Sequence, residues 1–489
     1  MDFLDPKKRQ RRDMFNIIGY GLIAIALVFA VRILFYQASG FGIDKNGKVT
    51  QSGLLFVASS PGGAQVRING VLDKAQTDAR LSLVSGTYNV KYSRDGYNNW
   101  QQTTNVEGGK IVRLDYATLF PKKLVTNAVK KYEGAVGLST QSPDRRWLLV
   151  QKPGSDNVFD QYDLKNPKFP STELTVPATV ISNGASDSWT LGEWSNDNEH
   201  VLMNHTHDGV SEFVLLDRSD MTKSVNLNTA FAVTPTKVSL VDKKFDRFYV
   251  YDAAAQTLKT ARLDAPAPQT YLSDVLEYQS YSDNVMLYAS SKTTTPGKVG
   301  VVLLLGGKSY FLREVSGNST YLLNLTQYNR EWYVAIGAKS ESKVYVYKNP
   351  NTQLTSNLGQ LVPISVLKTT TPNRLSFSSN ARFIMAENGS QFGVYDAEVN
   401  KSYQYDTKLP LDPPQAYANW MDGTRLAYSS GSKLVVFDFD NTNLQTLAAM
   451  DAQHTPFFVP DYKYMYSLAP AESGSQALTS TALRTPADL

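Results

Sequence analysis

The pattern of apolar and polar positions divides the chain into one long apolar run and a long series of short alternating segments. Residues 14–31 read MFNIIGYGLIAIALVFAV, in which Asn16 is the only strongly polar side chain. Beyond Arg32, which can extend its charge to the polar interface, the apolar stretch continues to Tyr36. Because about 20 apolar residues in a helix cross the hydrocarbon core, residues 14–36 predict a transmembrane helix that contacts the lipid bilayer.

Basic residues lie on one side of this run. Residues 1–13 contain the sequence KKRQRR, and such clusters stay in the cytoplasm. The sequence therefore predicts a single-pass signal anchor in the cytoplasmic membrane, with residues 1–13 inside and the C-terminal body extracellular. A cleaved signal peptide with a site near Ala38 is an alternative, although its apolar core is usually about 7–15 residues long. A buried helix of a soluble domain is a second alternative.

Short alternating runs separated by turn residues follow the apolar stretch. Asn46-Gly47 predicts a hairpin in a linker at 37–52, and Asn69-Gly70 predicts a second primed turn. The runs Gln65–Ile68 and Tyr88–Tyr92 alternate as strands do. We therefore expect a small antiparallel β-domain at 53–119.

The same segment resembles the PEGA domain family in the order and spacing of its motifs. Ser59-Ser60-Pro61-Gly62-Gly63-Ala64 is followed by Asn69-Gly70, then by Gly86-Thr87-Tyr88 and by Gly96-Tyr97. The family's usual G-x-T-P is replaced here by residues 74–78, KAQTD. The lead-in GIDKNGKVTQSG is similar to that of membrane-anchored surface proteins of ultra-small, Saccharibacteria-like candidate-phyla bacteria. The resemblance implies an exported interaction module without catalytic residues.

A looser pattern recurs from residue 122 to residue 484. A polar turn precedes a basic or polar residue, a short apolar strand and then a second strand. The clearest copies begin at Ser142, Ser195, Ser378 and Met421. Weaker copies centre on Asp242, Asp283, Arg330 and Asp461. The mean spacing of about 45 residues is typical of four-stranded propeller blades.

This repeat predicts a β-propeller of seven or eight blades and an all-β fold class. The text S-x-D-x-R resembles the WD40-like repeats of Tol-system propellers. We expect residues 124–136 to close the ring against the last blade, and residues 485–489 to form a dispensable tail. A row of separate β-sandwiches is the alternative, but it would leave sheet edges that a closed ring avoids.

Composition and charge narrow the chemistry. The chain has 28 Tyr, 21 Phe, 31 Gly and 22 Pro, a balance that favours strands and turns. It has no Cys, which excludes disulfides, thiolate metal sites and cysteine nucleophiles. Without the first 36 residues, 43 of the 49 basic and 42 of the 45 acidic residues are left. A nearly neutral body argues against a nucleic-acid partner.

Candidate catalytic and metal motifs are weak, so we assign no catalytic, cofactor-binding or metal-binding residue and no cofactor. His205 and His207 share a strand face, but no further ligand motif accompanies them. Residues 438–443 begin like a calcium loop and lack its later ligands, so a hairpin turn is the better interpretation. The motifs of P-loop, Rossmann, zincin and serine-hydrolase enzymes are missing from the sequence.

Two functions stay open at this level. The first is a non-enzymatic envelope protein whose propeller binds a polysaccharide, peptidoglycan or a surface protein. The second is an extracellular glycan hydrolase or lyase built on a propeller, because paired carboxylates need only converge in space. Three or more acids and histidines at one propeller mouth would favour the enzyme, and a surface of aromatic and amide groups would favour binding. The oligomeric state is not evident from the sequence.

Overall fold

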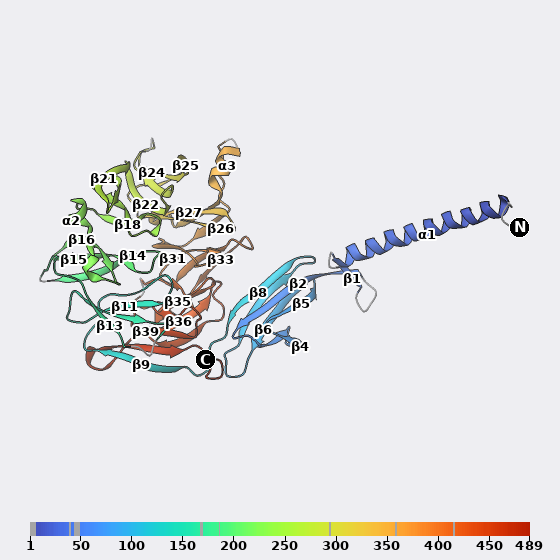
Figure 1. The fold of residues 1–489 in the computed structure, drawn as a ribbon, viewed down its shortest axis with the longest axis horizontal. Helices are drawn as coiled ribbons and strands as arrows, with labels where there is room; N and C mark the ends of the chain where they lie inside the picture. Colours follow the sequence, from blue (N-terminus) through green and yellow to red (C-terminus); the bar gives the residue numbers. More distant parts are fainter. Residues whose placement is uncertain are drawn as a thin grey trace. The chain divides into compact units, whose positions relative to one another are not determined.

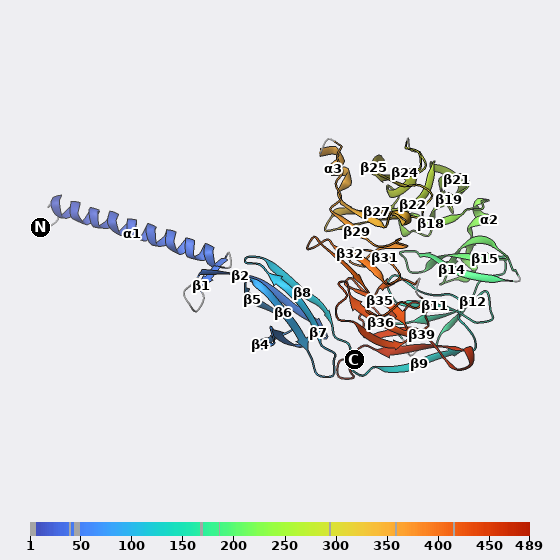
Figure 2. The same ribbon diagram turned by 180° about the vertical axis from the view of Figure 1, so that it is seen from behind.

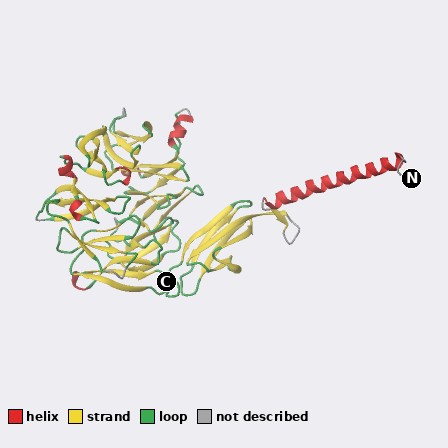
Figure 3. Cartoon of the chain, in the orientation of Figure 1, coloured by secondary structure: helices red, strands yellow, loops and turns green. Residues whose placement is uncertain are grey.

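The computed structural model describes residues 6–38, 41–43, 49–166, 170–184, 186–292, 295–356, 359–413 and 416–489. The described chain is mostly strand, with one long helix near the N-terminus (Figure 3). It forms two compact units. One contains the residues up to Lys123 together with Thr485–Asp488, and the other contains Leu124–Arg484 and Leu489.

Helix α1 spans Pro6–Ala38 and therefore continues the apolar run into the basic N-terminal segment. Its part from Asp13 to Tyr36 is long and apolar enough to cross a membrane, and its apolar side chains are exposed. An apolar surface without protein cover is what a membrane anchor or a signal peptide presents. The hairpin expected at Asn46-Gly47 lies outside the described residues.

The small β-domain contains two four-stranded sheets. The first has β1 (Phe41–Ile43), β2 (Val49–Ser60), β5 (Ala79–Val84) and β8 (Ile111–Thr118), and the second has β4 (Val71–Gln76), β3 (Gln65–Ile68), β6 (Gly86–Ser93) and β7 (Trp100–Val106). The expectation of an antiparallel domain needs one correction, because β2 and β8 are parallel. Strand β2 also begins inside the segment that we assigned to a linker.

Side chains from both sheets form the core of this domain. Tyr92 and Trp100 are buried and stacked with 4.9 Å between ring centroids, and the Tyr92 hydroxyl donates to the Leu114 carbonyl. The turn expected at Asn69-Gly70 is confirmed between β3 and β4. Both residues have positive φ values, 50° and 83°, as a primed hairpin turn requires.

The larger unit consists of eight four-stranded sheets in its described residues, which we number as blades 1 to 8. Blades 1 to 7 each contain four consecutive strands in antiparallel order. The strands of blades 1 to 4 are β10 (Ser139–Gln141), β11 (Trp147–Gln151), β12 (Val158–Asp163), β13 (Thr172–Thr175), β14 (Asp187–Trp194), β15 (His200–His207), β16 (Val210–Asp217), β17 (Val225–Asn226), β18 (Lys237–Leu240), β19 (Arg247–Asp252), β20 (Thr257–Arg262), β21 (Ala265–Leu272), β22 (Val275–Ser282), β23 (Val285–Ser290), β24 (Lys298–Leu305) and β25 (Lys308–Ser316).

Blades 5 to 8 continue the same order around the unit (Figure 1). Their strands are β26 (Tyr321–Tyr328), β27 (Glu331–Ala338), β28 (Lys343–Lys348), β29 (Ser365–Lys368), β30 (Arg374–Phe377), β31 (Phe383–Asn388), β32 (Gln391–Asp396), β33 (Lys401–Asp406), β34 (Asn419–Trp420), β35 (Arg425–Ser430), β36 (Lys433–Asp438), β37 (Gln445–Ala449), β38 (Phe457–Phe458), β39 (Tyr464–Pro470), β40 (Gln476–Ala482) and β9 (Val125–Tyr132). Short helices α2 (Leu227–Phe231) and α3 (Pro350–Ser356) lie in connections.

Blade 8 closes the ring with strands from both ends of the unit. Strand β9 pairs antiparallel with β40, and both views show it beside the C-terminal strands (Figures 1 and 2). Leu148 of β11 packs in one hydrophobic cluster with Tyr466 and Leu468 of β39, which joins blade 8 to blade 1. The expected closure by residues 124–136 is therefore confirmed, and the alternative of separate sandwiches is wrong.

The recurring turn motif supports the hairpin that follows it. In blade 6, Asn380 Oδ1 accepts hydrogen bonds from the Ser378 hydroxyl and the Arg382 backbone N–H. Arg382 then makes two hydrogen bonds, of 2.9 and 2.7 Å, to Asp396 at the end of the facing strand. Blade 1 repeats this arrangement with Arg146 and Asp163. The motif therefore stabilises the hairpins of the blades.

Candidate functional site in the propeller channel

The first strand of each blade lies at the centre of the ring. Strand β14 contacts β18, and β22 contacts β26, which contacts β30. A 2.8 Å hydrogen bond between the Ser239 and Tyr278 hydroxyls joins β18 to β22. Three of them, β14, β18 and β22, line a hollow of about 440 Å³, which we call the channel pocket. Its walls carry Thr190, Gly192, Glu193, Asn204, Phe213, Lys237, Ser239, Lys243, Tyr278, Gln279 and Ser280 among others. The central channel of a propeller is a concave surface of the kind in which ligands bind.

A register shift between Leu191 and Glu193 shapes one wall of the channel pocket. Gly192 occupies this irregularity, and an added Cβ would lie 2.9 Å from the Leu202 carbonyl oxygen. A side chain at this position would therefore collide with the backbone of the neighbouring strand. The shift turns Glu193 toward blade 3, as β-bulges commonly redirect a side chain next to a site.

Charged groups around the channel pocket are compensated. Glu193 accepts hydrogen bonds from the Leu240 backbone N–H and the Lys243 ammonium. Lys237 pairs with Glu277 at 2.9 Å and lies 4.6 Å from the centre of the Tyr278 ring. These pairs leave no uncompensated charge among the groups named here, so the pocket suits a neutral, hydrogen-bonding ligand better than an ion.

Asn204 is the distinctive group of the channel pocket. It pairs with Thr190 on one side and with Phe213 on the other, so the three side chains share one face of blade 2. Within the described part of the chain, its Oδ1 is buried without a hydrogen-bond partner. An unpaired buried carbonyl costs about 1–3 kcal/mol, and a ligand hydroxyl or N–H that reached it would recover part of that cost.

A second polar cluster lies inside blade 2 and contains one of the sequence candidates. His205 is fully buried, with Nδ1 2.8 Å from Glu212 Oε1 and Nε2 3.3 Å from Asp187 Oδ1. Asn226 donates to the same glutamate, so the cluster crosses all four strands of the blade. Burial raises the Glu212 pKa, but the hydrogen bonds from His205, Ser182 and Asn226 together outweigh it and lower the pKa below its usual value.

This cluster brings two acids and one histidine together, but the imidazole has no exposed surface. Trp189 covers it, with ring centroids 4.5 Å apart. The rings of His205 and His207 are 5.9 Å apart, which confirms that they share a strand face. In the described residues, no group of three or more His, Asp or Glu side chains is arranged to hold a metal ion. We interpret the cluster as a polar core that holds the blade together.

Glu387 is a second buried acid, near the end of β31 in blade 6. Its side chain has no exposed surface, and burial raises its pKa to about 8. Arg374 Nη1 lies 3.7 Å from its carboxylate, and the Ala418 backbone N–H donates to it at 2.9 Å. A carboxyl group with such a raised pKa could donate a proton, but its burial keeps it away from a bound polymer.

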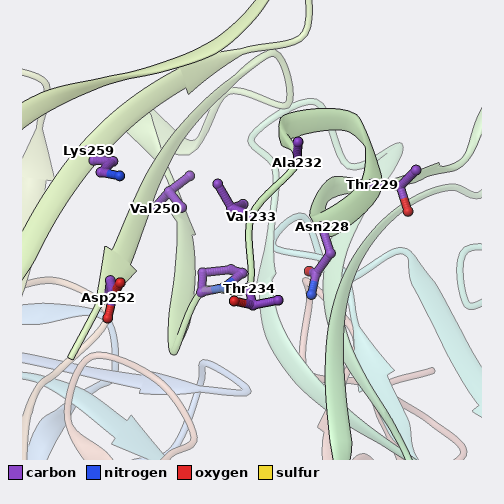
Figure 4. A pocket seen from close by; sticks show the side chains of 9 residues that line it. Asn228, Thr229, Ala232, Val233, Thr234, Val250, Asp252 and Lys259 are labelled. Carbon is purple, nitrogen blue, oxygen red and sulfur yellow. The ribbon is translucent and has the colours of Figure 1, made fainter. Parts of the chain in front are cut away.

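A separate hollow of about 550 Å³, the outer pocket, lies between blade 3 and the connecting segment 228–235, which contains α2 (Figure 4). Asp252 and Lys259 lie on one side and Thr229 on the other, with Val233 and Thr234 between them. Asp252 Oδ1 accepts hydrogen bonds from two backbone N–H groups of its own turn. A substitution in this outer pocket can therefore serve as a control for a substitution in the channel pocket.

The segment 438–443 forms the turn between β36 and β37, as the hairpin interpretation predicts. The backbone N–H of Asn441 donates to the Asp438 carbonyl, and Asn443 donates to the Asp438 carboxylate.

Sequence reasoning missed Asn204, since an asparagine in the middle of a strand has no motif around it. Only the alternation of β15 could have placed it on the face of Thr190.

Comparison with known proteins identifies the smaller unit. Residues 52–119 match the family model of the PEGA domain, which confirms the resemblance noted from the motifs. No curated protein was found to match the chain.

Among solved structures, similar ones include the dihydro-heme d1 dehydrogenase NirN in complex with DHE, at 16% identity and TM-score 0.42, covering 65% of this chain and 67% of that one. The Dos1 propeller is 12% identical with TM-score 0.42, covering 73% and 94%. Hsv2 of Kluyveromyces lactis is 10% identical with TM-score 0.39, covering 65% and 98%. The chain thus joins an N-terminal apolar helix and a PEGA domain to a propeller-like β-domain.

Proposed function

We propose that the protein is a membrane-anchored, extracytoplasmic binding protein of the cell envelope, and that its propeller binds a neutral glycan in the channel pocket. The unpaired Oδ1 of Asn204 carries this proposal. Thr190, Gln279 and Ser280 add hydroxyl and amide groups to the same walls. Envelope polysaccharides and the glycan strands of peptidoglycan present many hydroxyl donors, which match such a lining.

The basic residues at the start of α1, before its apolar part, support the extracytoplasmic placement. Positive residues stay in the cytoplasm, so the PEGA domain and the propeller would face the envelope. Partners confined to the cytoplasm are then unavailable, and a wall polymer or a surface protein is the accessible class. The nearly neutral body argues against nucleic acid.

A binding measurement on the full chain in lipid nanodiscs tests the proposal. The probes are soluble peptidoglycan fragments and oligosaccharides from a cell-wall digest, measured by calorimetry. We expect Asn204→Leu to weaken binding at least tenfold, about 1.4 kcal/mol. Lys259→Met, in the outer pocket, should leave the affinity unchanged. Equal affinity for the wild type and N204L, or binding only to a surface protein, would contradict a glycan site in the channel.

A glycan hydrolase or lyase is the second candidate. The convergence of Asp187, His205 and Glu212 is the feature that favours it, and the complete burial of the imidazole is the feature that speaks against it. The same incubations analysed by mass spectrometry distinguish the two functions, because an enzyme would shorten the oligosaccharides over time. Unchanged chain lengths together with saturable binding would support the binding protein.

A further inference from the structure

The C-terminal segment after β40 folds with the PEGA unit. Thr485–Asp488 belong to this unit although the preceding residues belong to the propeller. The Asp488 carboxylate accepts hydrogen bonds from the Tyr97 hydroxyl at 2.6 Å and from Arg94 Nη2 at 2.5 Å. The Tyr97 hydroxyl accepts in turn from the Thr485 backbone N–H at 2.9 Å. Both ends of the tetrapeptide are therefore bound, which argues against the dispensable tail that we expected.

The receiving residues form one loop, Arg94–Asn98, which we call the PEGA loop. Tyr97 is a core residue with 1% exposure, so its hydroxyl is held in place by packing. Arg94 lies over the Tyr97 ring and also donates to the Gly62 carbonyl. Gly96 has a φ of +78°, and an added Cβ would lie 3.2 Å from Thr485 Cγ2. The loop thus combines a fixed hydroxyl, a cation and a close backbone approach.

The PEGA loop also holds the segment that leads into the propeller. The Lys122 backbone N–H donates to the Gly96 carbonyl, and the Asn98 N–H donates to the Phe120 carbonyl, both at 2.9 Å. Inside the propeller, the two chain segments are direct neighbours, because Val125 of β9 pairs with Ala482 of β40. One loop therefore binds the chain on both sides of the strand pair that closes the ring.

We propose that the PEGA loop is a binding site for an acidic Thr-Pro-Ala-Asp peptide, which the chain fills with its own C-terminus, and that this contact secures the closing pair β9–β40. The attraction is charge-assisted, since an ionised carboxylate accepts from a guanidinium and a hydroxyl. The hydrogen bond from Tyr97 is the largest cause that lowers the Asp488 pKa, and Arg94 contributes to the shift. The contact is therefore complete near neutral pH and weakens as the carboxylate is protonated in acid.

Spin labelling tests the site directly, because the chain has no Cys. Ala487 is exposed, so Ala487→Cys introduces one thiol for a nitroxide in the full chain in nanodiscs. We expect a slow-motion spectrum, and a fast-motion spectrum when Arg94→Gln or Tyr97→Phe is added. Arg113→Gln, an exposed arginine elsewhere on the PEGA domain, should keep the slow spectrum.

Three results would overturn the binding site. The first is a fast spectrum in the otherwise unchanged chain. The second is release by Lys463→Gln, which loses only a contact to Leu489, and not by R94Q. The third is a slow fraction that grows with protein concentration, which would place the tail of a second copy in the loop.

Hydrogen exchange tests the consequence for the ring. In Asp488→Asn, we expect amides of β9 and β40 to exchange at least threefold faster than in the wild type, while those of blade 4 are unchanged. Unchanged exchange in β9 and β40 would contradict the role of the loop in closure.

Discussion

The PEGA domain and the propeller both bury the faces of short strands, but they connect those strands in opposite ways. In the PEGA domain, β2 pairs with β5 and, in parallel, with β8, so distant strands define each sheet. In the propeller, seven sheets use four consecutive strands, and β9–β40 is the pairing that spans the whole unit. The PEGA domain therefore depends on many non-local contacts, whereas the propeller depends on one seam.

The largest effect is expected at this seam. Deleting β9 exposes the edge of β40 and removes Tyr132, which is buried against blade 1. Truncating one buried aromatic costs about 3–5 kcal/mol, so loss of the strand should cost more than about 5 kcal/mol. Hydrogen exchange should show lost protection in β38–β40. Val129→Ala, on an exposed position of β9, is the control, and intact protection after the deletion would argue against a closed ring.

A core mutation in the PEGA domain should leave the propeller intact. Trp100→Ala removes the ring stacked on Tyr92 and should destabilise this domain by about 3–5 kcal/mol. Exchange should accelerate in β2 to β8 and stay slow in blades 2 to 6. A single cooperative loss of protection in both units would show that they do not unfold separately.

Much of this comparison follows from the sequence. The period of about 45 residues predicts the blades, because almost every blade is formed by strands that are consecutive in the sequence. The PEGA motifs identify the smaller domain. The parallel pair β2–β8 is not predictable from alternation, since a strand pattern does not specify its partner. Asn204 and the binding of Asp488 were missed for a related reason. The first depends on pairing with Thr190 of the neighbouring strand, and the second on a contact nearly 400 residues away in sequence.

Within the propeller, Glu387 should make stability depend on pH. Its folded pKa of about 8 is raised above the usual 4.5, so its contribution is complete below about 4.5 and is lost as the pH rises through 8. Glu387→Gln should remove this loss, a gain on the order of 4 kcal/mol at pH 8. Denaturant unfolding at pH 5 and pH 8 measures it, with the exposed Glu472→Gln as control. An unchanged pH slope in E387Q would be inconsistent with a buried neutral carboxyl.

A smaller effect of opposite sign is expected at Asp163 of blade 1. The Arg146 hydrogen bonds lower the pKa of Asp163 to about 2 from the usual 3.8. Its contribution is therefore present above about 3.8 and is lost as the pH falls through 2. Asp163→Asn should flatten the acid limb of the unfolding curve, while Asp156→Asn, on an exposed side chain, should not. If the acid limb of D163N is as steep as that of the wild type, carboxylates other than Asp163 cause the loss of stability in acid.

The side of the membrane on which the propeller lies tests the proposed envelope-binding function most directly. Because the chain has no Cys, Ala254→Cys in an exposed turn of blade 3 and Asp13→Cys at the start of the apolar run each provide one thiol. A membrane-impermeant maleimide is added to intact cells. We expect labelling of A254C on intact cells and of D13C only after permeabilisation. Labelling of D13C alone on intact cells would place the propeller in the cytoplasm and contradict an envelope-binding function.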